Sequence, residues 1–125
     1  MTEDMLSKRK EIGAIGEKLA VDFLKKRGYK ILHKNFRCRG GEIDIIAQQG
    51  DCLVFVEVRT KKGSGFGTPE ESVTRSKQER LISLANTYLQ TCDNPPSSWR
   101  IDVVAIELAS NNKVSRLEHI ENAVS

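Results

Sequence analysis

Residues 41–59 read GEIDIIAQQGDCLVFVEVR, and this stretch decides the fold expected for the chain. It holds two apolar runs rich in Ile and Val, residues 43–47 and 52–58, on either side of Gln48-Gln49-Gly50-Asp51. That linker has the chemistry of a turn, so the two runs predict a β-hairpin. Both runs are nearly continuous in apolar residues, which is typical of strands covered on both faces rather than of a surface ribbon.

Each apolar run carries one carboxylate, Asp44 in the first and Glu57 in the second. Charged groups in apolar strands are costly unless they are paired, hydrogen-bonded or bound to a cation. A turn near Gly50 places Asp44 roughly opposite Glu57, and Arg59 points to the same face as Glu57. Two carboxylates can hold Mg²⁺ next to a phosphodiester. The alternative, which spacing alone favours, is an ion-pair cluster in which Arg59 neutralises Asp44 or Glu57.

A helix over residues 7–27 is predicted from apolar residues at helical spacing: Ile12, Ile15, Leu19 and Phe23. Gly28 follows the last turn as a stop signal. Glu17 lies beside the apolar face and can reach the hairpin carboxylates, although an exposed Glu17 is the simpler alternative. Gly13 and Gly16 each cost about 1 kcal/mol of helix propensity, which is tolerated where a helix closely approaches another backbone. Glu42, two residues before Asp44, is either an outer acid of the same site or a solvated strand end.

The remaining pattern predicts a mixed sheet. Further strands are expected at residues 29–36, 99–107 and 114–120, a second helix at 70–90, a basic turn at 37–41 and a glycine-rich loop at 61–69. The order α-β-β-β-α-β-β gives an α/β fold, a central mixed β-sheet flanked by helices, in a single domain spanning residues 1–125. Arg100 and Asp102 in one of these strands suggest a cross-strand salt bridge.

Basic residues are unevenly distributed, although the formal net charge is only +3. They are concentrated in the chain up to Arg39 and again from Arg59 to Arg80, a pattern that suits DNA or RNA as well as it suits a solvated surface. The residues expected to hold a nucleic-acid backbone are Arg37, Arg39, Lys61, Lys62, Lys77 and Arg80. No apolar run approaches the roughly 20 residues of a membrane span, and the charged N-terminus lacks a secretory pattern, so the cytoplasm is the expected location.

Several short motifs, taken in order, resemble the YraN-like family of poorly characterised bacterial proteins. They are GAIGE at 13–17, NFR at 35–37, GEIDII at 41–46, VFVEVRT at 54–60, Lys77 followed by Arg80-Leu81, and HIENA at 119–123. The resemblance implies the restriction-endonuclease-like fold of the PD-(D/E)XK superfamily and similarity to archaeal Holliday-junction resolvases. It also implies that Glu17, Asp44 and Glu57 match acidic positions for Mg²⁺ or Mn²⁺. Related resolvases act as symmetric dimers, which makes a homodimer an expectation by analogy.

Arg59 stands where the superfamily pattern has a lysine. A buried lysine can lose its proton and activate water, whereas arginine stays protonated and can only clamp a phosphate or stabilise developing charge. Lys61 is a second candidate for the lysine's role. The leading hypothesis is therefore a metal-dependent nuclease that cuts phosphodiester bonds in DNA, branched DNA included. The alternatives are a catalytically weakened nucleic-acid-binding module of the same fold and, ranked last, a protein-interaction scaffold.

Overall fold

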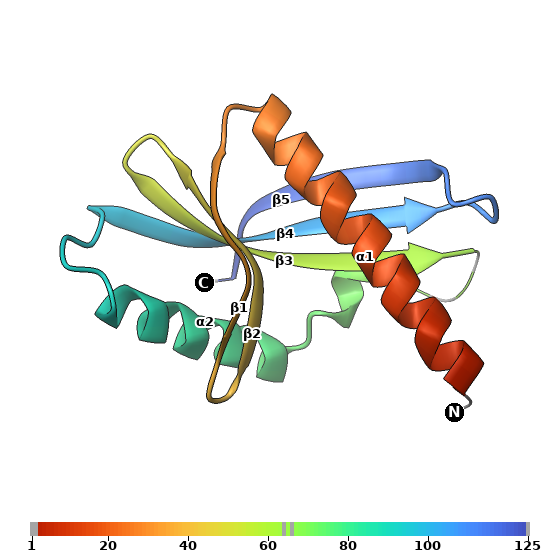
Figure 1. Cartoon of the computed structure of the whole chain (residues 1–125), viewed down its shortest axis with the longest axis horizontal. Helices are drawn as coiled ribbons and strands as arrows, with labels where there is room; N and C mark the ends of the chain where they lie inside the picture. The colour runs from red at the N-terminus through yellow and green to blue at the C-terminus, as the bar shows by residue number, and fades with distance from the viewer. Residues whose placement is uncertain (1–2, 64, 66, 125) are drawn as a thin grey trace.

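The computed structural model describes residues 3–63, 65 and 67–124. Within this part, five strands form one sheet in the order β1-β2-β3-β4-β5. The elements in chain order are α1 (Glu3–Lys26), β1 (Lys30–Cys38), β2 (Gly41–Gln49), β3 (Cys52–Lys62), the 3-10 turn η1 (Pro69–Ser72), α2 (Arg75–Gln90), β4 (Ser98–Leu108) and β5 (Val114–Val124) (Figure 1). β3 pairs with β4 in parallel, and the other neighbours are antiparallel. The predicted mixed sheet and the restriction-endonuclease-like α/β fold are confirmed.

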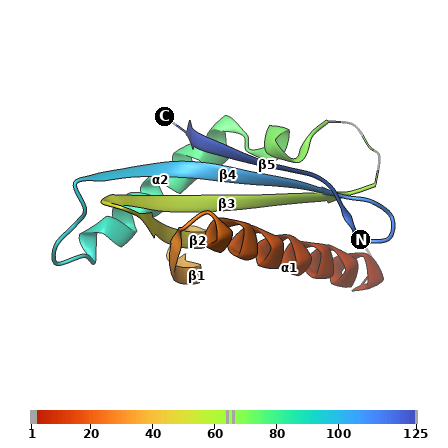
Figure 2. The same cartoon turned by 90° about the horizontal axis from the view of Figure 1, so that it is seen from above.

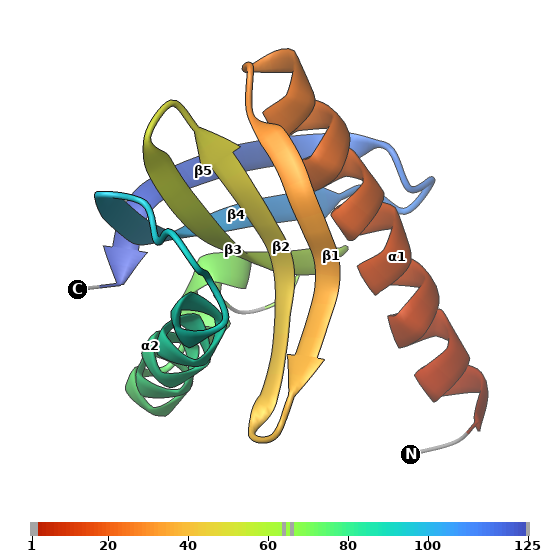
Figure 3. The same cartoon turned by 60° about the vertical axis from the view of Figure 1, so that its left-hand side comes forward.

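The two helices cover opposite faces of the sheet, so the central strands are buried on both sides. Figure 3 shows α1 and α2 on either side of the β1–β2 hairpin, and Figure 2 shows α1 running alongside β3. Along β3, Val54 and Val56 belong to the apolar cluster under α1, whereas Leu53 and Phe55 belong to the cluster under α2. This alternation explains why the strand reads as one continuous apolar run. None of the helices in the described residues is both long and apolar enough to cross a membrane.

The second helix differs from its predicted bounds of 70–90. Residues 69–72 form the separate turn η1, and α2 begins only at Arg75. The break has a local cause, since the Thr74 hydroxyl accepts a hydrogen bond from the Lys77 N–H at 3.2 Å and caps the new helix. The cap fixes the first turn of α2, and therefore Lys77, next to the middle of the sheet.

The predicted loop at 61–69 and the predicted turn at 37–41 are both too long. β3 continues to Lys62 because it pairs with β4 as far as Lys62 opposite Leu108, a contact that local sequence does not reveal. The turn between β1 and β2 is only Arg39-Gly40, since Cys38 already pairs with Gly41. The last strand also extends beyond residue 120, to Val124.

Gly16 lies where α1 approaches β3 closely. A Cβ atom at Gly16 would lie 1.8 Å from Thr60 Oγ1, so any side chain there collides with the strand. The expectation of a close approach is confirmed for Gly16 and is wrong for Gly13, where a Cβ atom would meet nothing within 4 Å. The contact at Gly16 holds the next residue, Glu17, close to the sheet.

The predicted cross-strand salt bridge between Arg100 and Asp102 is wrong in its geometry. Both residues are on β4, and Arg100 Nε lies 2.9 Å from Asp102 Oδ1 within the strand. The cross-strand contact of Asp102 is His119 on β5, whose Nε2 lies 2.8 Å from Oδ2. Burial raises the pKa of Asp102, but the hydrogen bonds with His119, Arg100 and the Asn122 N–H outweigh it and hold the pKa below its usual value.

Candidate functional site

Asp44 marks the point where β2 leaves β3. Backbone pairing runs from Gln49 opposite Cys52 to Ile45 opposite Val56. At the next position the Asp44 carboxylate accepts a hydrogen bond from the Val58 N–H, with Oδ2 at 2.8 Å. The side chain therefore supplies the acceptor that a departing strand no longer provides. This arrangement puts Asp44 beside Glu57, the relationship expected from the hairpin.

Glu57 is paired with a lysine from α2. Its side chain is buried, with 5% of the residue exposed, and Oε2 lies 3.3 Å from Lys77 Nζ. Arg59, two residues further along β3, does not take this position, because its Nε donates to Ser72 Oγ of η1 at 2.7 Å. The alternative considered for this site, in which Arg59 neutralises Asp44 or Glu57, is therefore wrong, and the cation paired with Glu57 is Lys77.

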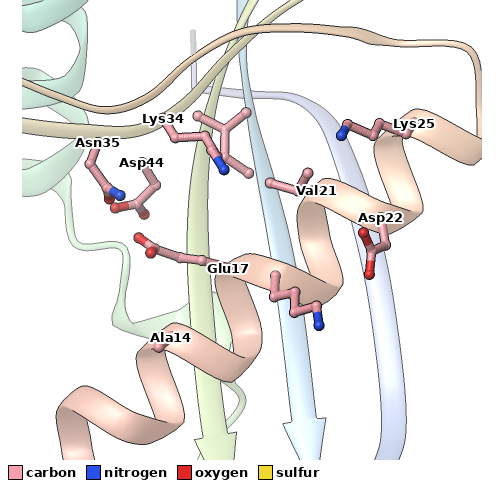
Figure 4. A pocket seen from close by; sticks show the side chains of 10 residues that line it. Ala14, Glu17, Val21, Asp22, Lys25, Lys34, Asn35 and Asp44 are labelled. Atoms are coloured by element: carbon pink, nitrogen blue, oxygen red, sulfur yellow. The ribbon is translucent and has the colours of Figure 1, made fainter.

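Two further carboxylates converge on Asp44. One oxygen each of Glu17, Glu42 and Asp44 all lie within 4.8 Å of one another. Glu17 comes from α1, whereas the other two come from β2, two residues apart. Figure 4 shows the side chains of Glu17 and Asp44 pointing toward each other across the gap between helix and sheet. Glu42 is therefore part of the cluster and not a solvated strand end.

Asn35 links the acids and was not expected as a site residue. In the amide orientation that satisfies its hydrogen bonds, Nδ2 donates to Glu17 Oε1 at 3.0 Å and to Glu42 Oε1 at 2.7 Å. Its backbone has φ 55°, a left-handed conformation that asparagine tolerates better than most residues. The NFR motif contained this residue, but nothing in its spacing indicated that the side chain meets the acids.

The crowded acids perturb one another. The pKa of Asp44 is raised well above its usual range. Burial is the largest cause, followed by the hydrogen bond with Glu57 and the repulsion from it. The pKa of Glu17 is also raised, first by burial and then by repulsion from Glu42. Both shifts favour a protonated acid in the metal-free protein. A bound cation would remove the repulsion, and this makes the cluster a candidate metal centre.

A cleft of about 350 Å³ opens next to the cluster. Acids form one part of its lining and basic side chains another. The acids are Glu17, Glu42, Asp44 and Glu57, and the basic residues are Arg59, Lys77 and Arg80. The cleft thus combines groups that attract a cation with groups that attract a phosphate.

The other basic residues predicted to hold nucleic acid lie outside the lining of this cleft. Arg37 is near its edge, with Nε 3.3 Å from Glu42 Oε2 and most of its side chain exposed. Arg39 is in the exposed β1–β2 turn, and Lys62 is exposed at the end of β3. Lys61 Nζ donates to the Gly67 carbonyl at 2.5 Å, so it contacts the loop that follows β3.

Comparison with known proteins identifies the family of this chain. The model of the uncharacterised protein family UPF0102 matches residues 16–106, which include every acid of the cluster and the basic residues of the cleft. The chain belongs to the UPF0102 family. The resemblance to YraN-like proteins is thereby confirmed.

Relatives in this family cover nearly the whole chain. The UPF0102 protein of Caldicellulosiruptor saccharolyticus is 44% identical over 115 residues, which are 92% of this chain and 98% of the relative. The UPF0102 protein of Roseiflexus castenholzii is 45% identical over 121 residues, 96% of this chain and 98% of the relative. That of Dehalococcoides mccartyi is 46% identical over 120 residues, with the same coverage of both chains. These names state a family and no activity.

Proposed function

We propose that this UPF0102 protein is a metal-dependent nuclease that hydrolyses phosphodiester bonds in DNA. The observation that carries the proposal is the convergence of four carboxylates with Arg59, Lys77 and Arg80 on one cleft. Acids alone are common on protein surfaces, and basic residues alone would indicate only phosphate binding. The combination suits a reaction in which a cation and a phosphate meet.

The carboxylates fit a hard divalent cation. Glu17, Asp44 and Glu57 are the ligands expected from the family resemblance, and Glu42 joins them because its oxygen lies within the same 4.8 Å group as those of Glu17 and Asp44. Oxygen ligands of this kind suit Mg²⁺ and Mn²⁺. When bound, such an ion polarises the phosphate and lowers the pKa of a coordinated water. The Val58 N–H and the Asn35 amide hold the acids in place for it.

Arg59 and Lys77 together take the roles that a single lysine has in the superfamily pattern. Arg59 stays protonated, and Ser72 fixes its guanidinium, so it is suited to clamp a phosphate oxygen. Lys77 lies against Glu57 and can position the attacking water or stabilise charge on the leaving oxygen. Although arginine occupies the lysine position of the superfamily pattern, the cleft still contains a lysine, Lys77.

The substrate follows from the same residues. Contacts from arginine and lysine to phosphate carry no sequence information, so binding should be sequence-independent and weaken with salt. Branched DNA as the preferred form, a homodimer as the active assembly and a cytoplasmic location belong to this proposal as expectations from the resemblance and the sequence.

A second candidate function is a nucleic-acid-binding module that has lost cleavage. One specific observation favours it: the Lys77 ammonium already neutralises Glu57 in the metal-free protein, which lowers the attraction of that acid for a cation. Under this alternative, DNA binding persists when Asp44 is removed, and no metal induces cleavage.

The test is cleavage of labelled linear, flapped and four-way-junction DNA with Mg²⁺ or Mn²⁺, with Asp44→Ala protein purified in parallel. Cleavage by the wild type that is absent in the variant supports the nuclease and ranks the substrates. DNA binding by both proteins without cleavage supports the binding module. Equal cleavage by both proteins contradicts the proposed site, because it would come from a contaminant or from other residues.

A further inference from the structure

A second pocket of about 410 Å³ lies between α1 and β1, on the other side of Glu17 from the cleft. The pocket and the cleft share Glu17 and Asp44 in their linings. We call it the flanking pocket. Lys25 and Lys34 also line it, and Figure 4 shows Lys34 on the side of Asn35 and Asp44 and Lys25 at the end far from the acids.

Lys25 and Lys34 are exposed, and within the described residues neither ammonium group takes part in a salt bridge. Apart from the two acids of the site, three lysines and one acid, Asp22, line the pocket. These lysines lie directly beside an acid cluster that repels phosphates. A DNA strand with one phosphate at the acids would have cationic side chains for its neighbouring phosphates on both sides. These are Lys77 and Arg80 in the cleft and Lys25 and Lys34 in the flanking pocket.

The floor and the size of the pocket restrict what it can hold. Val21 and Ile45 give the floor an apolar part, which suits the face of a sugar or a base. The volume is in the range of pockets that take small molecules, about 300–1,000 Å³. A single unpaired nucleotide fits these features, with its apolar parts on the floor and its phosphate at the lysines. In a duplex the faces of the bases are stacked on one another, so only an unpaired nucleotide can lay a base on this apolar floor.

We propose that the flanking pocket binds one unpaired nucleotide next to the scissile phosphate, and that Lys25 and Lys34 contact its phosphate. The proposal rests on the nuclease function and refines it, since it names DNA with an unpaired nucleotide beside the cut as the substrate class. Flapped DNA has such nucleotides, whereas a continuous duplex and a fully paired four-way junction do not. Glu17 then lies between the cleft and the flanking pocket, and the DNA strand passes over it.

The test compares two double variants that remove the same charge. Lys25→Gln/Lys34→Gln removes two of the three lysines that line the flanking pocket. Lys26→Gln/Lys113→Gln is the control, because both of its lysines are exposed and neither lines the pocket. Binding of a labelled single-stranded oligonucleotide and of a blunt duplex is measured by fluorescence anisotropy over a salt series. Ca²⁺ replaces Mg²⁺ in these experiments to prevent cleavage during the measurement.

For the single strand, the pocket variant should make the fall of log affinity with log salt less steep by about 0.7, the value for one phosphate that is no longer neutralised. Its duplex affinity should match that of the control variant. Equal single-strand slopes in the two variants overturn the pocket proposal, while binding and cleavage by the wild type leave the nuclease intact. An equal loss on duplex and single strand overturns the assignment to an unpaired nucleotide. A wild type without affinity for either DNA overturns both proposals.

Discussion

Lys77 Nζ lies 3.3 Å from Oε2 of Glu57, the most buried carboxylate of the cleft. The two residues are on different elements, α2 and β3, and they meet because the Thr74 cap starts α2 next to the centre of the sheet. The sequence places Arg59 near Glu57, yet Arg59 is bonded to Ser72. The lysine of this site therefore comes from the helix and the arginine from the strand.

Replacing Lys77 by methionine should reduce both cleavage and stability. The change keeps the length of the side chain but leaves Glu57 buried without its cation, which should cost about 1–2 kcal/mol, given that the lysine is itself partly exposed. Cleavage should fall on the order of 100-fold, because Lys77 would no longer position the attacking water or stabilise charge on the leaving oxygen. Urea denaturation and initial cleavage rates measure the two effects.

Arg80→Met is the matched control for Lys77→Met, since it removes one charge from the same helix and the same cleft without touching Glu57. It should weaken DNA binding while stability changes little. If both variants lose cleavage equally and neither loses stability, Lys77 acts only as another phosphate contact.

Gly16→Ala should destabilise the protein although alanine favours helices. The new Cβ atom would lie 1.8 Å from Thr60 Oγ1, so α1 must move away from β3, at a cost of about 1–3 kcal/mol. Gly13→Ala, in the same helix and with no atom within 4 Å of the new Cβ, should instead stabilise by about 0.5–1 kcal/mol. Thermal and urea unfolding of both variants check the opposite signs. Two variants of the same sign would show that α1 does not pack on β3 as described.

Asp44→Asn should make the metal-free protein more stable. The pKa of Asp44 is raised in the fold, so between about pH 4, the ordinary carboxyl range, and that raised value the folded state binds more protons than the unfolded chain. Stability of the wild type therefore falls as pH rises across this window, and the asparagine variant should escape this loss and gain about 1–2 kcal/mol at neutral pH. Unfolding in EDTA at several pH values tests this. A less stable variant at neutral pH, or an identical pH dependence, contradicts the charge crowding described for the cluster.

Asp102→Asn should have the opposite effect on stability. The pKa of Asp102 is lowered in the fold. The ionised carboxylate therefore stabilises the folded state above about pH 4, and this stabilisation is lost as the pH falls through the lower pKa of the folded protein. Removing the charge leaves Arg100 without its main partner and should cost about 3 kcal/mol at neutral pH. Denaturation at neutral and at acid pH measures this, and the difference between wild type and variant should shrink in acid. A difference that is constant with pH would assign the loss to packing.

The hairpin and the position of its acids could be predicted from sequence because both depend on local rules. Side chains alternate along strands, and a turn near Gly50 sets the register, so Asp44 had to lie near Glu57. The apolar face of α1 was equally visible from its spacing. These predictions needed no knowledge of how distant elements pack.

The remaining part of the site depends on contacts between distant elements. Lys77 reaches Glu57 only through the crossover from β3 through α2 to the parallel strand β4, and nothing local to either residue indicates it. Asn35 meets Glu17 and Glu42 because its backbone is left-handed in the middle of β1. The flanking pocket forms between α1 and β1, and Lys25 and Lys34 looked like ordinary surface lysines.

Calorimetric titration of Mn²⁺ into the metal-free wild type and into Asp44→Asn tests the central claim most directly. The wild type should bind at least one ion per chain, and the heat should depend on the buffer, because ligation releases the proton held by the acid cluster. The asparagine variant should lose this binding while it remains folded. Mn²⁺ binding that is absent from the wild type, or equal in the two proteins, would contradict a metal centre built on Asp44.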